Sequence, residues 1–131
     1  MAKKKIIFAI DDDPVVHGVF TSLLTPEYDL RISKSAADAE ILMSKVKPDL
    51  ILLDIEMPDI SGFEFLHTIK TNPRYISVPV IIVSGHCESA FIEHAKKGGA
   101  STIVAKPVNG DDLSKTIKEA LSKPQAGIFG L

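Results

Sequence analysis

Short apolar runs alternate along this chain with longer stretches in which apolar residues recur every three or four positions. Continuous aliphatic runs are typical of strands that are buried on both faces of a sheet. The run with Tyr28, Leu30 and Ile32 differs because charged residues alternate with the apolar ones, so we expect a half-exposed strand at an edge. The predicted strands are 6–10, 28–32, 50–53, 78–83 and 102–105.

Helix start and stop signals separate these strands. Asp13-Pro14 combines an N-cap residue with proline at the first helical position, and Pro26 stops the helix that follows. Ser35 with Asp38 three residues later resembles a capping box, and Asn109 caps the last helix. The other helices carry the apolar stripes Ala39-Leu42-Met43-Val46, Phe65-Leu66-Ile69 and Phe91-Ile92-Ala95.

Five βα units with short connections and no internal repeat predict an α/β fold with parallel strands and right-handed crossovers. The two continuous apolar strands that end in aspartates are expected at the centre, beside the weaker second strand. This arrangement suits a five-stranded sheet in the order 2-1-3-4-5, in which the switch point lies next to the first strand.

Composition narrows the class of protein. The 131 residues are enough for one domain, and the content of 45% hydrophobic and 24% charged residues is typical of a soluble globular protein. A net charge of −2 does not favour nucleic-acid binding, and no apolar run is long enough to span a membrane. The single cysteine, Cys87, fits a reducing compartment, so we expect a cytoplasmic protein. We assign residues 1–123 to the domain and 124–131 to a tail or the start of a linker.

Polar residues follow the apolar runs of four strands, and the carboxyl ends of parallel strands share one edge of a sheet. Asp11, Asp12 and Asp54 would therefore lie together, and neighbouring carboxylates are costly to bury unless a cation neutralises them. Oxygen ligands of this kind suit Mg²⁺. The simpler alternative is that the first aspartates only cap a helix, although Asp13 alone accounts for the cap.

The same edge carries groups suited to phosphoryl transfer. A carboxylate such as Asp54 can act as a nucleophile and form an aspartyl-phosphate. The hydroxyl of Ser84 and the ammonium of Lys106 would then contact the phosphoryl oxygens. Each residue taken singly has a structural alternative, because polar residues at strand ends are commonly turn residues.

These residues carry a family resemblance. The motifs Asp11-Asp12-Asp13-Pro14, Asp54–Gly62, Val83-Ser84-Gly85 and Lys106-Pro107, in this order, resemble the receiver domain of bacterial two-component response regulators. The resemblance covers about residues 5–122. It implies a flavodoxin-like fold of the chemotaxis type, in which Asp54 accepts phosphate from a sensor histidine kinase or a phosphotransfer protein.

The resemblance also implies individual roles. Asp12 would bind Mg²⁺ directly, Asp11 would act mainly through water, and the backbone carbonyl of Glu56 would be a further ligand. Ser84 would contact the phosphoryl group, and Lys106 would pair with it. The Lys106-Pro107 peptide would be cis. The domain would pass its signal to a downstream protein or a fused output domain, without enzymatic turnover beyond its own phosphorylation and dephosphorylation.

One position departs from the family pattern, and two others invite a hypothesis. Receivers often carry an aromatic residue three positions before the lysine, where this chain has Ile103, so the aromatic half of the usual switch is absent. Glu56 and His86 each lie two residues beyond a site residue. We hypothesise that they pair across the mouth of the site and slow the loss of phosphate, the alternative being two independent solvated side chains.

Two other functions compete with a phosphorylated switch. Asp11-x-Asp13 resembles the nucleophile loop of haloacid-dehalogenase-like phosphatases, but Asp54 would then have no role and no late acidic pair ends a strand. The second alternative is a receiver that serves only as an unphosphorylated docking module.

Overall fold

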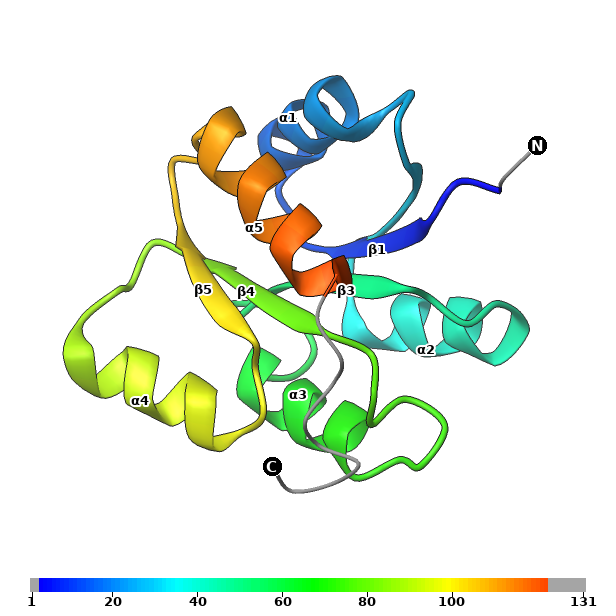
Figure 1. The fold of residues 1–131 in the computed structure, drawn as a ribbon. Helices are drawn as coiled ribbons and strands as arrows, with labels where there is room; N and C mark the ends of the chain where they lie inside the picture. The colour runs from blue at the N-terminus through cyan, green and yellow to red at the C-terminus, as the bar shows by residue number, and fades with distance from the viewer. Residues whose placement is uncertain (1–2, 123–131) are drawn as a thin grey trace.

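The computed structural model describes residues 3–122, which form a five-stranded parallel sheet between two layers of helices (Figure 1). The strand order is β2-β1-β3-β4-β5, which confirms the predicted flavodoxin-like topology. The strands are β1 Ile6–Ile10, β2 Asp29–Ser33, β3 Leu50–Asp54, β4 Val80–Ser84 and β5 Thr102–Ala105. The helices are α1 Pro14–Leu24, α2 Ala36–Lys45, α3 Gly62–Lys70, α4 Ser89–Lys97 and α5 Gly110–Ser122.

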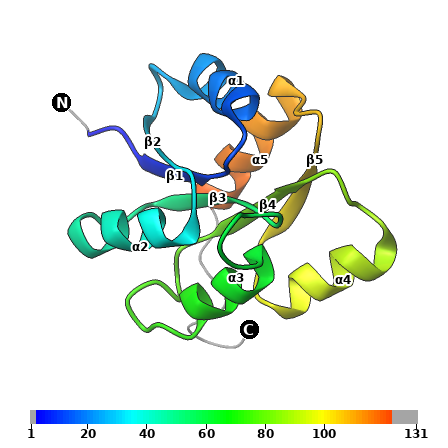
Figure 2. The same ribbon diagram turned by 180° about the vertical axis from the view of Figure 1, so that it is seen from behind.

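The two helical layers bury the two faces of the sheet. Figures 1 and 2 show α1 and α5 on one face and α2, α3 and α4 on the other. Phe20 of α1 belongs to the core between the sheet and the first helical layer. Phe8 of β1 and Phe65 of α3 belong to the core between the sheet and the second layer. Strands β1, β3 and β4 are almost completely buried, so the continuous apolar runs lie at the centre of the sheet as predicted.

The helices begin where the capping signals predicted. The Asp13 carboxylate accepts from the Val15 N–H at 2.9 Å, with proline at the first helical position. The Ser35 hydroxyl accepts from the Asp38 N–H at 3.1 Å. The Asn109 side chain likewise accepts an N–H from the first turn of α5. These caps satisfy N–H groups that have no partner inside the helix.

The structure corrects some strand boundaries. β4 begins at Val80 rather than Val78, because Pro79 has no N–H to give to a neighbouring strand. β3 extends one residue further than predicted and includes Asp54. β2 begins and ends one residue later than predicted, and it is an edge strand with mostly half-buried residues, as expected.

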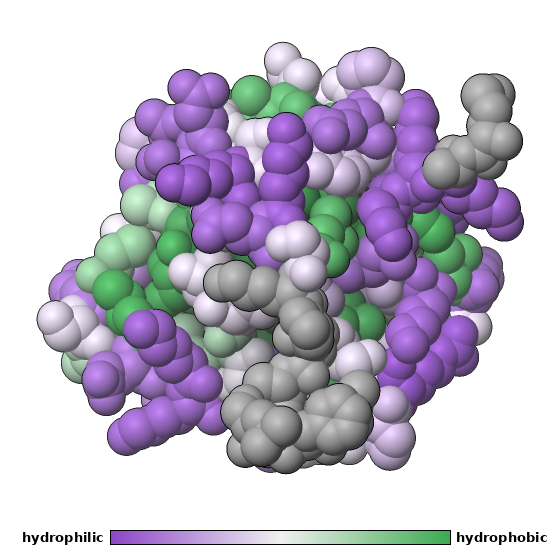
Figure 3. Space-filling view, viewed as in Figure 1, coloured by the Kyte–Doolittle hydropathy of each residue, from purple (hydrophilic) through white to green (hydrophobic). Residues whose placement is uncertain are grey.

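Two X-Pro peptides are cis among the described residues: the expected Lys106-Pro107 and, not foreseen, Thr25-Pro26. Within residues 3–122 no helix combines the length and the apolar character required to span a bilayer. Hydrophilic side chains cover most of the face seen in Figure 3. The predicted tail or linker, 124–131, lies outside the described residues.

Candidate functional site

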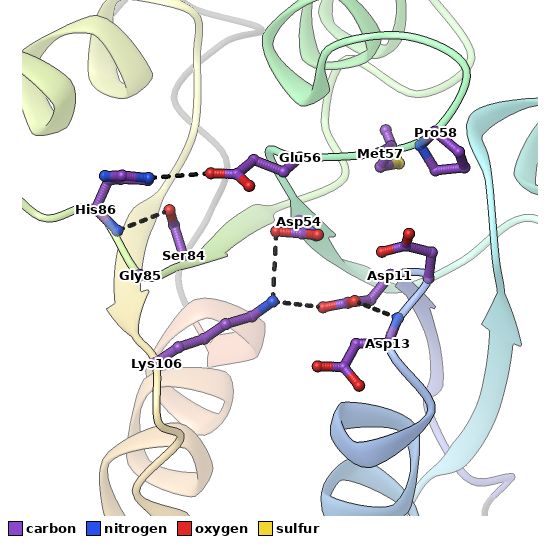
Figure 4. A pocket seen from close by; sticks show the side chains of 11 residues that line it. Asp11, Asp13, Asp54, Glu56, Met57, Pro58, Ser84, Gly85, His86 and Lys106 are labelled. Carbon is purple, nitrogen blue, oxygen red and sulfur yellow. Dashed lines mark hydrogen bonds and ion pairs between the residues drawn. The ribbon is translucent and has the colours of Figure 1, made fainter.

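A pocket of about 510 Å³ opens at the carboxyl ends of the central strands (Figure 4). It receives Asp11 from the end of β1, Asp54 from β3, Ser84 from β4 and Lys106 from just after β5. The four strand ends that the sequence marked are therefore brought together. The full lining is Asp11, Asp12, Asp13, Asp54, Glu56, Met57, Pro58, Ser84, Gly85, His86 and Lys106.

Lys106 bridges the two buried carboxylates of the pocket. Its Nζ donates to Asp11 Oδ2 at 2.9 Å and lies 3.4 Å from Asp54 Oδ1. Burial by itself would lower the pKa of Lys106, but the hydrogen bond to Asp11 and the two negative charges outweigh it and raise the pKa. Lys106 is therefore held as a cation between Asp11 and Asp54.

The pocket disfavours the charged form of the Asp54 carboxyl group. Its side chain is 8% exposed, and burial is the largest cause that raises its pKa, followed by the negative charge of Asp11. Lys106 and the backbone N–H of Glu56 oppose the shift without cancelling it. Burial and the neighbouring charge of Asp11 therefore make the ionised form of Asp54 costly in this pocket.

Three carboxylates converge closely enough to share a cation. One oxygen from each of Asp11, Asp12 and Asp54 lies within 4.8 Å of the others. Asp11 and Asp54 are buried, whereas Asp12 is exposed at the pocket mouth. Hard oxygen donors with one accessible side are what Mg²⁺ prefers, and Lys106 is the one cation within 4 Å of these three carboxylates among the described residues. The residues present therefore fit a Mg²⁺ site.

Ser84, Glu56 and His86 line the side of the pocket formed by the loops after β3 and β4. The Ser84 hydroxyl is buried and accepts from the His86 N–H at 3.0 Å. The predicted contact between Glu56 and His86 is present, with His86 Nε2 3.0 Å from Glu56 Oε1. His86 Nδ1 lies 3.8 Å from Glu88 as well, so the imidazole sits between two carboxylates.

Two contacts shape the loop after β3, which carries Glu56 into the pocket. A Cβ on Gly62 would lie 2.4 Å from the Asp54 carbonyl oxygen and 2.5 Å from the Ile55 Cα, so only glycine fits. At the tip of the loop, the Asp59 carboxylate accepts N–H groups from Ala36 and Ala37, at 3.2 and 2.9 Å. These bonds, the Ala37 N–H foremost, lower the pKa of Asp59. The loop is therefore fixed both to β3 and to the start of α2.

Sequence reasoning missed the role of Asp59 and that of His17. The sequence places His17 in the first helix without indicating a partner, but its Nε2 contacts the Asp11 backbone carbonyl. No local motif marks either contact. For His17 the available signal is its place one turn inside a helix that begins directly after the acidic residues.

An aromatic cluster lies beside the pocket, and we define it as Phe63, His86, Phe91 and His94. The ring centroids of Phe63 and Phe91 are 5.0 Å apart, those of Phe63 and His94 4.2 Å, and those of His86 and Phe91 5.6 Å. Phe91, part of an apolar helix stripe in the sequence, is only half-buried. Ile103 is also half-buried and packs against the same core. The aromatic side chains near this site thus come from α3, from α4 and from the loop between β4 and α4, rather than from β5.

Comparison with known proteins agrees with this arrangement. The family model of the response regulator receiver domain matches residues 7–118. Regulatory protein LuxO of Vibrio cholerae is 30% identical over 115 residues, which make up 87% of this chain and 25% of LuxO. Transcriptional regulatory protein KdpE of Staphylococcus aureus is 29% identical over 116 residues, 88% of this chain and 49% of KdpE. The chain therefore spans between a quarter and a half of these curated relatives.

Solved structures show the same fold. The signal receiver domain of a DNA binding response regulator from Colwellia psychrerythraea superposes with a TM-score of 0.83 at 31% identity, covering 91% of this chain and 99% of that one. A response regulator receiver domain protein (CheY-like) from Methanospirillum hungatei gives a TM-score of 0.82 at 28% identity, covering 91% and 94%. With its sheet order, its acidic pocket and a family match over most of its length, this chain belongs to the response regulator receiver domain family.

Proposed function

We propose that this chain is a phosphoacceptor domain, in which Asp54 receives a phosphoryl group from a sensor histidine kinase or a phosphotransfer protein in a Mg²⁺-dependent reaction. The observation that carries the proposal is the position of Asp54. It lies in an open pocket beside a lysine and two further carboxylates. A carboxylate needs such surroundings to act as a nucleophile toward a negatively charged phosphoryl group.

In this proposal the chain's own residues divide the work. An Asp54 carboxylate oxygen forms the bond to phosphorus while the phosphorus–nitrogen bond of the donor histidine breaks, and the freed imidazole nitrogen keeps the electron pair. Lys106, already 3.4 Å from Asp54, pairs with a phosphoryl oxygen, and the Ser84 hydroxyl donates to another. Asp11, Asp12, Asp54 and the Glu56 carbonyl would hold Mg²⁺. The bound ion would neutralise charge on the carboxylates and the phosphoryl group.

Incubation with acetyl phosphate tests this function. We expect a covalent phosphoryl adduct in the presence of Mg²⁺, mapped by mass spectrometry to the peptide that contains Asp54, and none after chelation with EDTA. A phosphatase would instead turn over p-nitrophenyl phosphate steadily, which we do not expect. A docking module that works unphosphorylated would show unchanged amide spectra with beryllofluoride and Mg²⁺. An adduct on any other residue would refute the proposal.

The contact between Glu56 and His86 supports a further part of the proposal, namely that this pair shields the phosphoryl group from water. Both side chains are largely exposed, and exposed pairs contribute little. We therefore expect Glu56→Asn to speed dephosphorylation by only about two- to fivefold. Loss of phosphate from protein labelled with radioactive acetyl phosphate measures the rate. Glu93→Asn, at an exposed position on α4, is the control and should match the wild type; an unchanged rate in Glu56→Asn would end the idea.

The wider role follows from family membership. The phosphorylated state would favour a second arrangement of the loops after β3 and β4, and a downstream protein or a fused output domain would read it. The surface of α4, β5 and α5 is the proposed contact. We do not assign direct nucleic-acid or membrane binding to this domain, and its single cysteine fits the cytoplasm.

A further inference from the structure

We propose that His17 is a positioning residue for the Mg²⁺ site, because it fixes the Asp11–Asp12 peptide and thereby aims the Asp12 carboxylate. The proposal rests on the function proposed above. It begins from a contact between α1 and the end of β1: His17 Nε2 donates to the backbone carbonyl of Asp11. A carbonyl oxygen only accepts hydrogen bonds, so Nε2 carries the hydrogen in this contact.

Asp11 is fixed on every side. Its backbone N–H donates to the Ser33 carbonyl at 3.0 Å, which ties it to β2. Its carboxylate accepts from the Asp13 N–H at 2.9 Å and from Lys106 at 2.9 Å. The remaining polar group of Asp11 is the carbonyl, and His17 satisfies it. Loss of the imidazole would remove this hydrogen bond from the Asp11 carbonyl, which belongs to the peptide unit that Asp11 shares with Asp12.

Asp12 has no comparable anchor. Its side chain is exposed, and among residues 3–122 its carboxylate has no hydrogen bond or ion pair. Its direction therefore depends on its backbone. A peptide unit is planar, so the Asp11 carbonyl oxygen and the Asp12 Cα lie in one plane. A hydrogen bond that holds this oxygen fixes the rotation of the peptide plane. It thereby fixes the direction in which the Asp12 side chain projects from the backbone.

The side chain that holds this peptide comes from a helix, α1. His17 lies in α1, where its N–H donates to the Asp13 carbonyl at 3.1 Å and its carbonyl accepts from the Thr21 hydroxyl at 2.8 Å. The half-buried imidazole reaches from this helix back to the end of β1. Partners that orient metal ligands in this way commonly change metal affinity by 10–100-fold when they are removed.

Titration of the uniformly labelled protein with MgCl₂, followed by NMR at the amides of residues 12 and 13, tests the inference. We expect His17→Ala and His17→Asn to weaken Mg²⁺ binding by about tenfold. Asn places its amide nitrogen near Nδ1 and cannot reach the carbonyl. His17→Gln places its amide nitrogen near Nε2, so it should bind Mg²⁺ within about threefold of the wild type. His67→Ala removes an exposed histidine of α3 and is the matched control.

The outcomes distinguish a failure of this inference from a failure of the proposed function on which it rests. If the wild type does not bind Mg²⁺, the proposed function fails. If the wild type binds and His17→Ala binds equally well, His17 has no positioning role. If His17→Gln loses as much affinity as His17→Asn, the hydrogen bond is not the cause and the inference is overturned. Should His17→Ala fail to fold, the comparison of His17→Gln with His17→Asn gives the same decision.

Discussion

Replacing Asp54 with asparagine should abolish phosphorylation by acetyl phosphate and, in the absence of Mg²⁺ at pH 7, make the fold more stable. The amide is nearly the same size but offers no carboxylate nucleophile. It also removes a negative charge that is buried close to Asp11, while Lys106 keeps its bond to Asp11 at 2.9 Å. We expect a gain of roughly 1–3 kcal/mol, the range for relieving an unfavourable buried polar group, measured by urea denaturation in EDTA.

The pH dependence gives the sign of this effect independently. Burial raises the pKa of Asp54 above its ordinary value of 3.8, so the folded state holds this proton more tightly than the unfolded chain. The free energy of unfolding therefore falls as pH rises from about 3.8 through the raised pKa, and the full cost is present above that window. The advantage of Asp54→Asn should shrink as pH falls through that window. Asp111→Asn, at an exposed position in α5, should gain nothing.

Gly62→Ala should be the most destabilising single-methyl change in the site, at about 3 kcal/mol. The added Cβ would meet two backbone atoms, the Asp54 carbonyl oxygen at 2.4 Å and the Ile55 Cα at 2.5 Å. Backbone atoms of a buried strand end cannot move aside as a flexible side chain would. The loop would shift instead, and Glu56 would shift with it. Urea denaturation measures the loss of stability, and the acetyl phosphate reaction should slow in the fraction that still folds.

The matched control is Gly18→Ala in α1. A Cβ on Gly18 would meet no heavy atom within 4 Å outside its chain neighbours and the adjoining backbone of α1, and the residue is exposed in a helix interior. Alanine there should raise the free energy of unfolding by about 0.5–1 kcal/mol, because glycine is a poor helix former. Equal effects at positions 18 and 62 would contradict the steric argument.

Much of this fold could be read from local patterns. Each central strand is a continuous apolar run, and each of the first two helices begins at a side chain that does cap it, Asp13 and Ser35. The convergence of Asp11, Asp54, Ser84 and Lys106 also follows from sequence, because parallel strands bring their carboxyl ends to one edge. Local signals suffice where a residue's role depends on its own strand or helix.

What the sequence did not indicate depends on side chains that reach out of their own helix to the backbone of a neighbouring segment. Lys70 is an example: it ends α3 like an ordinary helix cation, yet its Nζ donates inward to the carbonyls of Ile76 and Val78, at 3.2 and 2.6 Å. Burial lowers the pKa of Lys70 to about 8. The same holds for the bond of His17 to Asp11, since neither periodicity nor capping rules describe a side chain that reaches back to a strand end.

The bonds from Asp59 to Ala36 and Ala37 bear on the order in which the chain can fold. Ser35 supplies α2 with one capping bond from within its own segment, but the partner of the first two N–H groups is 22 to 23 residues further along the chain. Until β3 has paired with β1 and the loop beyond it has turned, those two groups have only water. The beginning of α2 is thus complete only when the loop that carries Glu56 to the pocket is in place.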